Sequence, residues 1–200
     1  MAGTKTTDDF EIRRTRPHDL DAVVEIVEHS FDTGDNQRLL GRRVLRAMFD
    51  LLLASRNSIL LVVEARDHVI GFVWVEPEQL LLWKLALFSP LKSLKLACAL
   101  VLDGKFSVLR RIRSQESYAG ATGIYPRIVS LAVMAPFRKI GLAGRLVDEG
   151  LRELKTRGSV SCFVTTAPEN SVAVNFYKRR GFIVTPDQGK EIILRKDISG

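Results

Sequence analysis

The segment from Ser130 to Leu151, SLAVMAPFRKIGLAGRLVDEGL, most constrains what this chain can fold into. An apolar run typical of a buried strand stops near Pro136, and apolar residues then recur with helical spacing. Gly141 and Gly144 lie between the two patterns and lack the Cβ atoms that would keep a ligand from the backbone. Three basic residues lie beside them: Arg138, Lys139 and Arg145. Free N–H groups at a helix start, with these charges, predict a phosphate-binding loop.

The spacing in this loop excludes two common nucleotide-binding motifs. The stretch RKIGLAG contains neither GxxxxGK[ST] nor GxGxxG, so it is neither a P-loop nor a dinucleotide-binding turn. Glycines between a strand and a helix also serve as ordinary turn residues. By itself the loop supports a phosphate site and a simple turn equally well.

Hydrophobic periodicity along the rest of the chain predicts a mixed sheet with helices on its faces. Seven segments have strand patterns, either alternating or as β-branched apolar runs, at residues 9–16, 58–65, 68–77, 126–134, 159–167, 182–186 and 190–197. Four have helical spacing, at residues 16–31, 38–55, 137–158 and 171–180. The short polar turn between the second and third strands indicates a hairpin.

The net charge of +7 is concentrated in one part of the chain. Seven basic residues lie between Gln79 and Ser114, where Asp103 is the single acid, so this segment carries six of the seven surplus charges. The remainder is close to neutral, which argues against a general nucleic-acid-binding surface.

The same region, at about residues 79–118, interrupts the order of strands and helices. Ser89 and Pro90 have the pattern of a helix start, and Asp103-Gly104 that of a stop. We therefore expect a basic, apolar helical insertion in a single domain of residues 1–200. Lysines and a proline break its apolar runs before the roughly 18 residues of a membrane span. It fits a helical subdomain packed on the sheet or on a second subunit, or a helix at a membrane surface.

Cys98 and Cys162 lie far apart in apolar surroundings. They have neither metal-ligand spacing nor a disulfide framework, so we expect two buried, reduced thiols and no metal. The first residues, MAGTKTTDDFEIRR, lack the apolar core of a secretory signal, and we expect a cytoplasmic location.

A second motif, NSVAVNFYKRRGF, runs from Asn170 to Phe182. With RKIGLA at 138–143 it resembles the GCN5-related N-acetyltransferase (GNAT) superfamily, whose patterns are Q/R-x-x-G-x-G/A and N-x-x-A-x-x-F/L-Y-x-x-x-G-F. The resemblance covers the chain except the insertion. Two departures are small: Ala143 stands where glycine is frequent, and Pro136 lies one place later than the usual proline.

The resemblance implies an α/β (α+β) GNAT fold, with a mixed, mostly antiparallel sheet, helices on both faces and the insertion between the third and fourth strands. It also implies an acyltransferase that moves an acetyl group from acetyl-CoA to a primary amine by direct attack, without a metal. The cofactor would lie where the fourth and fifth strands part.

The resemblance assigns roles to individual residues. The backbone of Leu131, Ala132 and Val133 would pair with the pantetheine arm, and an N–H of Ala132 or Val133 would stabilise the oxyanion. The diphosphate would bind the N–H groups of Arg138, Lys139, Ile140, Gly141, Leu142, Ala143 and Gly144.

Three residues of the second motif complete the implied site. Asn170 would bond the pantetheine, Phe176 would pack beside it, and Tyr177 would act as general acid toward the thiolate. Structural alternatives exist for each residue. Asn170 can be a helix N-cap, Phe176 also suits the core, and Tyr177 can be a core aromatic.

Glu76, at the end of the third strand, is the candidate general base. The alternative is an exposed acid at a strand end. His29 has a suitable side chain but equally suits packing or capping, and Asp32 and Asp35 could recognise a cationic amine.

The insertion precedes the fourth strand, so we expect it on the acceptor side. A basic, apolar lid there favours a small amine that carries negative charge, such as a nucleotide-linked or membrane-anchored amino sugar, and no other nucleic-acid partner. The alternatives are protein lysine or N-terminal acetylation, and a non-catalytic acetyl-CoA sensor or membrane-surface protein. A peripheral membrane contact and a homodimer through the insertion remain open.

Overall fold

The computed structural model describes residues 10–31, 39–55, 57–78, 89–105, 124–186 and 191–200. Seven strands form one sheet in the order β1-β2-β3-β4-β5-β7-β6. The strands are β1 (Glu11–Arg14), β2 (Ile59–Ala65), β3 (His68–Glu76), β4 (Arg127–Val133), β5 (Ser161–Thr166), β6 (Ile183–Val184) and β7 (Ile192–Asp197). Every neighbouring pair is antiparallel except β4 and β5, which are parallel. The expected mixed, mostly antiparallel sheet is confirmed.

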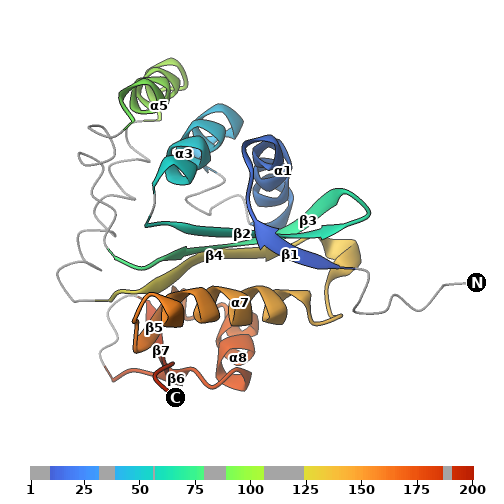
Figure 1. Cartoon of the computed structure of the whole chain (residues 1–200), viewed down its shortest axis with the longest axis vertical. Coiled ribbons are helices and arrows are strands. Elements are labelled where there is room, and N and C mark those ends of the chain that lie inside the picture. Colours follow the sequence, from blue (N-terminus) through green and yellow to red (C-terminus); the bar gives the residue numbers. More distant parts are fainter. Residues whose placement is uncertain (1–9, 32–38, 56, 79–88, 106–123, 187–190) are drawn as a thin grey trace, which may run out of the picture.

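Helices cover both faces of this sheet (Figure 1). The α-helices are α1 (Leu20–Ser30), α3 (Arg42–Ala54), α5 (Pro90–Leu102), α7 (Leu142–Thr156) and α8 (Ser171–Arg179), with short 3-10 turns η2 (Pro17–Asp19) and η3 (Ala135–Phe137). The apolar stripe of α7 packs on one face, with Leu142, Leu146 and Leu154 almost fully buried. Helices α1 and α3 bury a second cluster on the other face, around Phe49 and Phe72.

Alternation along the strands explains this two-sided core. On β3, Val73 and Val75 point to the α7 side, while Phe72 and Trp74 point to the α1 and α3 side. A strand buried on both faces reads as a continuous apolar run, which is how GFVWVE appears in the sequence.

Helix α5 lies outside α3, on the side away from the sheet (Figure 1). Two ion pairs hold it there: Lys92 Nζ lies 3.0 Å from Asp50 Oδ1, and Arg43 Nη1 lies 3.2 Å from Asp103 Oδ1. It supplies the described part of the expected insertion. The remaining parts, residues 79–88 and 106–118, lie outside the described residues.

The two cysteines differ in exposure. Cys162 is buried, as expected, but Cys98 is exposed, so the prediction for Cys98 was wrong. The reason is that α5 buries one side only, through Ala99 and Leu100, and Cys98 lies on the opposite side. None of the helices among the described residues has both the length and the apolar character needed to span a bilayer.

A buried ion pair joins α1 to β1. The Arg13 guanidinium donates to both carboxylate oxygens of Asp19, at 2.7 and 2.9 Å, and Nε donates to Glu64 at 2.7 Å. The backbone N–H of Arg16 also donates to Asp19, at 2.7 Å. Burial by itself would raise the pKa of Asp19, but these hydrogen bonds outweigh burial and lower the pKa below its usual value.

We predict that Asp19→Asn lowers the free energy of unfolding by about 2 kcal/mol at pH 7, because the neutral amide leaves the Arg13 charge poorly compensated. The folded-state pKa of Asp19 lies below its unfolded value of about 3.9, so its stabilisation is complete above that pH and lost as pH falls through the folded-state value. Urea unfolding at pH 7 and pH 3 should therefore show the difference between variant and parent shrinking with acid. Asp21→Asn, at an exposed pair with Arg46, is the control and should change stability by less than about 1 kcal/mol. An undiminished difference at pH 3 would contradict the assignment.

Candidate active site

Strands β4 and β5 part soon after they meet. Their pairing consists of Arg127 with Phe163 and Ile128 with Val164, and from there on β4 pairs only with β3 among the strands that the structure describes. On the side away from β3, the backbone of Leu131 and Val133 has no paired strand among the described residues. Such an edge offers N–H and C=O groups to an extended ligand.

Strand alternation decides which groups of β4 face this opening. Met134 N–H donates to Ile70 O on β3 at 2.8 Å, and Ala132 pairs with Phe72. Backbone groups of successive residues point to opposite edges, so Ala132 points to β3 as Met134 does. The N–H groups of Leu131 and Val133 therefore face the opening. The carbonyl of Val133 accepts a hydrogen bond from Arg138 Nε at 2.8 Å, which ties the loop to the strand end.

The loop after β4 has the conformation of an anion-binding turn. Lys139 has φ +65° and Gly141, the N-cap of α7, has φ +90°. The N–H groups of Leu142, Ala143 and Gly144 lie in the first turn of α7, where a helix supplies no acceptors for them. These are the donors that the sequence predicts for a phosphate, at the positive end of the helix dipole.

Two of the three basic side chains here make contacts within the protein. Arg138 bonds Val133 O, as described above, and Arg145 Nη2 donates to Phe10 O at 3.2 Å beside β1. Both guanidinium groups, of Arg138 and Arg145, thus already bond backbone carbonyls of the protein. The backbone N–H groups and the helix dipole are therefore the features of this loop that best suit an anion.

Helix α8 brings the residues of the second motif to the same side of the sheet as α7. Asn170 Oδ1 accepts a hydrogen bond from Ala173 N at 3.0 Å, which confirms the N-cap reading. The ring centres of Phe176 and Phe182 lie 5.0 and 5.2 Å from the ring centre of Tyr177, in edge-to-face arrangements. Tyr177 is 6% exposed, and burial raises its pKa well above the usual value, so the phenol stays protonated.

A buried charged pair lies where β4 and β5 meet. Arg127 donates to Glu76 Oε2 from Nε at 3.2 Å and from Nη2 at 3.0 Å, and its guanidinium lies 5.0 Å from the Tyr125 ring centre. Glu76 is 1% exposed, so the alternative of an exposed strand-end acid is wrong. Sequence reasoning missed Arg127, because only the β3–β4 register places it opposite Glu76.

The other acidic and basic candidates near α1 do not gather at this point. His29 is exposed and its Nδ1 lies 2.8 Å from Glu25 O, one turn back on α1, which is a capping contact. Asp32 and Asp35 lie outside the described residues.

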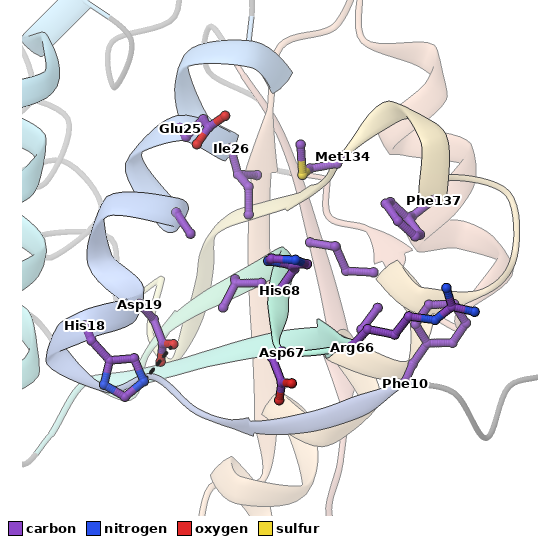
Figure 2. Close-up of a pocket in the computed structure, with 14 residues that line it drawn as sticks. Phe10, His18, Asp19, Glu25, Ile26, Arg66, Asp67, His68, Met134 and Phe137 are labelled. Atoms are coloured by element: carbon purple, nitrogen blue, oxygen red, sulfur yellow. Dashed lines mark ion pairs between the residues drawn. The ribbon is translucent and has the colours of Figure 1, made fainter.

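A separate cavity of about 590 Å³ lies under α1, between the β2–β3 turn and η3 (Figure 2). Ile26, His68, Met134 and Phe137 are among its lining residues. Because these residues come from three segments distant in sequence, no local pattern could have indicated it. It lies on the α1 face of the sheet and not in the opening between β4 and β5.

The family follows from a comparison with family models. The model described as the acetyltransferase (GNAT) family matches residues 20–182, and the chain belongs to this family. It is therefore an acyltransferase that uses acetyl-CoA as co-substrate. A comparison with curated proteins finds no match.

Solved structures share the fold at low sequence identity. The crystal structure of SsHAT has a TM-score of 0.72 at 17% identity, covering 96% of this chain and 100% of that one. The PaiA N-acetyltransferase of Thermoplasma acidophilum, in complex with coenzyme A, has a TM-score of 0.62 at 15% identity, covering 94% and 98%. The ribosomal-protein-S18-alanine N-acetyltransferase of Escherichia coli has 0.58 at 14%, covering 96% and 95%.

The site's residues also bear on metal chemistry. Within the part of the chain that the structure describes, His, Cys, Asp and Glu side chains form no group of three suited to a metal.

The opening, the helix start and the free strand edge match the parts of an extended ligand that carries a diphosphate.

We predict that Gly141→Ala weakens coenzyme A binding about tenfold, because a Cβ disfavours φ +90° and shifts the N–H groups of the loop. Gly158→Ala is a matched control. Gly158 has φ +82°, also with open space around it, but follows the far end of α7. Both variants should lose about 1 kcal/mol of stability in urea unfolding, and calorimetry should show weaker binding only for Gly141→Ala. Equal dissociation constants for the two variants would remove the loop from the binding site.

Proposed function

We propose that acetyl-CoA lies along the free edge of β4 and that the enzyme transfers its acetyl group to the primary amine of a small, negatively charged molecule. The early parting of β4 and β5, after Ile128 and Val164, is the observation that carries the first half of this proposal. The edge at Leu131 and Val133 would pair with the pantetheine amides, while Asn170 and Phe176 would bound the arm from α8. The N–H groups from Arg138 to Gly144 would hold the diphosphate.

The proposed reaction is the direct attack of an amine on a thioester. The thioester supplies an activated acyl group, and the acceptor amine forms the new C–N bond as the C–S bond breaks. The N–H of Val133, which faces the opening, would stabilise the negative charge on the carbonyl oxygen. The alternative donor, Ala132, points to β3 by strand alternation.

Tyr177 would donate its hydroxyl proton to the departing thiolate. Burial keeps this phenol protonated, so it is ready as a donor at neutral pH. The raised pKa also makes it a weaker acid than the thiol formed. A hydrogen bond to the thiolate sulfur, rather than complete proton transfer, is therefore the larger contribution we expect from Tyr177.

Glu76 is the base we propose for the amine proton. Arg127 holds its carboxylate rigidly at the point where β4 and β5 meet, close to the buried start of the opening. A carboxylate there could act directly or through water. The Arg127 charge beside it also suits an acceptor that carries an anionic group, such as a nucleotide-linked amino sugar.

The insertion supports the anionic acceptor by its charge, since residues 79–114 carry six of the seven surplus charges of the chain. Its described helix, α5, packs on α3 away from the β4–β5 opening, so α5 is not the expected lid, and the rest of the insertion lies outside the described residues.

Protein acetylation is the second candidate, and the surface of α5 favours it. Leu91, Leu94, Val101 and Leu102 are each at least 60% exposed and lie along one side of this helix. An exposed apolar row of this kind suits a protein substrate, a second copy of the chain or a membrane surface. One structural neighbour is named for acetylating the alanine of a ribosomal protein.

An acceptor panel tests the choice between these functions. Purified enzyme with acetyl-CoA would be offered nucleotide-linked amino sugars, neutral amino sugars, polyamines, and peptides with free lysines or N-termini, with thiol release as the readout. We expect the anionic amino sugars to have the highest kcat/KM. Turnover of cationic polyamines or peptides alone would contradict the proposed acceptor. Coenzyme A binding without turnover of any amine would favour the non-catalytic sensor.

We predict that Tyr177→Phe lowers kcat about 10²-fold with the best acceptor, because it removes the donor for the thiolate but keeps the buried ring. The KM for acetyl-CoA and the unfolding midpoint should change little. Val172→Ala, at a 79% exposed position on the same helix, is the control and should match the parent. An unchanged kcat in Tyr177→Phe would leave Tyr177 as a core aromatic only.

A further inference from the structure

Arg180 comes from the end of α8, but its guanidinium lies against the first turn of α7. A Cβ built on Gly144 would lie 1.4 Å from Nη2 and 2.2 Å from Cζ of Arg180. The guanidinium therefore fills the space that any side chain at position 144 would occupy. This contact explains why a helix position that needs no special backbone conformation is a glycine.

Two neighbours hold Arg180 in this place. Nη1 donates to both carboxylate oxygens of Asp148, each at 2.8 Å, and the guanidinium carbon lies 5.5 Å from the Phe176 ring centre. Nε and Nη2 have no hydrogen-bond partner among the residues that the structure describes. The side chain is 27% exposed, and Nη2 and Nε are the guanidinium nitrogens that lie nearest to Gly144.

The electrostatics of this position call for an anion. The start of α7 carries the positive end of the helix dipole, and a cation beside it is unfavourable. Asp148 accepts hydrogen bonds from Nη1, while Nη2 and Nε lie beside Gly144 in the first turn of α7, the turn whose N–H groups have no helical acceptors. An arginine fork is a strong phosphate binder, because its donors match phosphate oxygens in pairs.

We propose that Arg180 is a phosphate ligand, which adds two charge-assisted hydrogen bonds from α8 to the diphosphate of coenzyme A held by the loop on α7. The inference rests on the proposed cofactor position. It goes beyond that proposal because Arg180 lies outside the glycine loop and at a position that the second motif leaves unspecified. Gly144 makes room for the guanidinium, and Asp148 and Phe176 orient it.

Calorimetry with coenzyme A tests the proposal directly. We expect Arg180→Ala to raise the dissociation constant about tenfold or more, since a hydrogen bond to a charged group is lost. Arg179→Ala removes the same charge from the preceding, exposed position of α8, and its dissociation constant should stay within about twofold of the parent's. Arg180→Lys keeps the charge without the fork and should lie between the two.

A second variant tests the arrangement by a different route. Gly144→Ala leaves Arg180 in the sequence but displaces its guanidinium, so it should weaken binding to a similar degree. The double variant should then lose little more than either single one. Thermal unfolding of each variant checks that the fold is intact.

Dephospho-coenzyme A, which keeps the diphosphate but lacks the 3′-phosphate, identifies the phosphate involved. The loss caused by Arg180→Ala should be the same with this ligand as with coenzyme A. A loss that disappears would overturn the diphosphate assignment, and a dissociation constant for Arg180→Ala equal to the parent's would overturn the role of Arg180. If the parent bound neither ligand, the cofactor position itself would fail, and the inference with it.

Discussion

The parting of β4 from β5 is the feature on which the rest of this site depends. Two residue pairs join the strands, and beyond Ile128 and Val164 the sheet opens. Unpaired backbone in a protein interior is unfavourable unless another group satisfies it. An extended molecule with amide groups would satisfy this edge, and the acetyl-CoA that this family uses contains such a segment. In the proposed cofactor position, the backbone edge would bind the ligand without any specialised side chain.

Two helices, α7 and α8, lie on the same side of the sheet. Helix α7 begins with N–H groups that have no helical acceptor, and α8 packs Phe176 and Tyr177 into the core on that side. The Phe176, Tyr177 and Phe182 rings anchor α8 to the core, so the hydroxyl and the N-cap residue are held by packing. Arg180, at the end of α8, links the two helices by donating hydrogen bonds to Asp148 on α7.

The opposite face of the sheet carries α1 and α3, which are held there by an ion pair and by aromatic packing. Arg13 and Asp19 fix the start of α1 on β1, and Phe49 of α3 packs on Phe72 and Trp74. Because β3 is buried on both sides, these helices and α7 determine where its last residue, Glu76, can lie. The same packing contacts therefore stabilise this layer and fix the position of the candidate base, Glu76.

Local patterns by themselves determined much of this protein. Apolar spacing with glycines at 141 and 181 predicted the strand, loop and helices correctly, since capping and periodicity act over a few residues. The same reasoning wrongly predicted that Cys98 is buried, because apolar neighbours in the sequence do not show which side of α5 contacts α3. Tertiary structure decided the rest: the register that pairs Glu76 with Arg127, the strand edge that Val133 presents, and the fit of Arg180 over Gly144. The two residue pairs are 51 and 36 positions apart, and the strand edge depends on which strands pair, so only chain packing sets these relations.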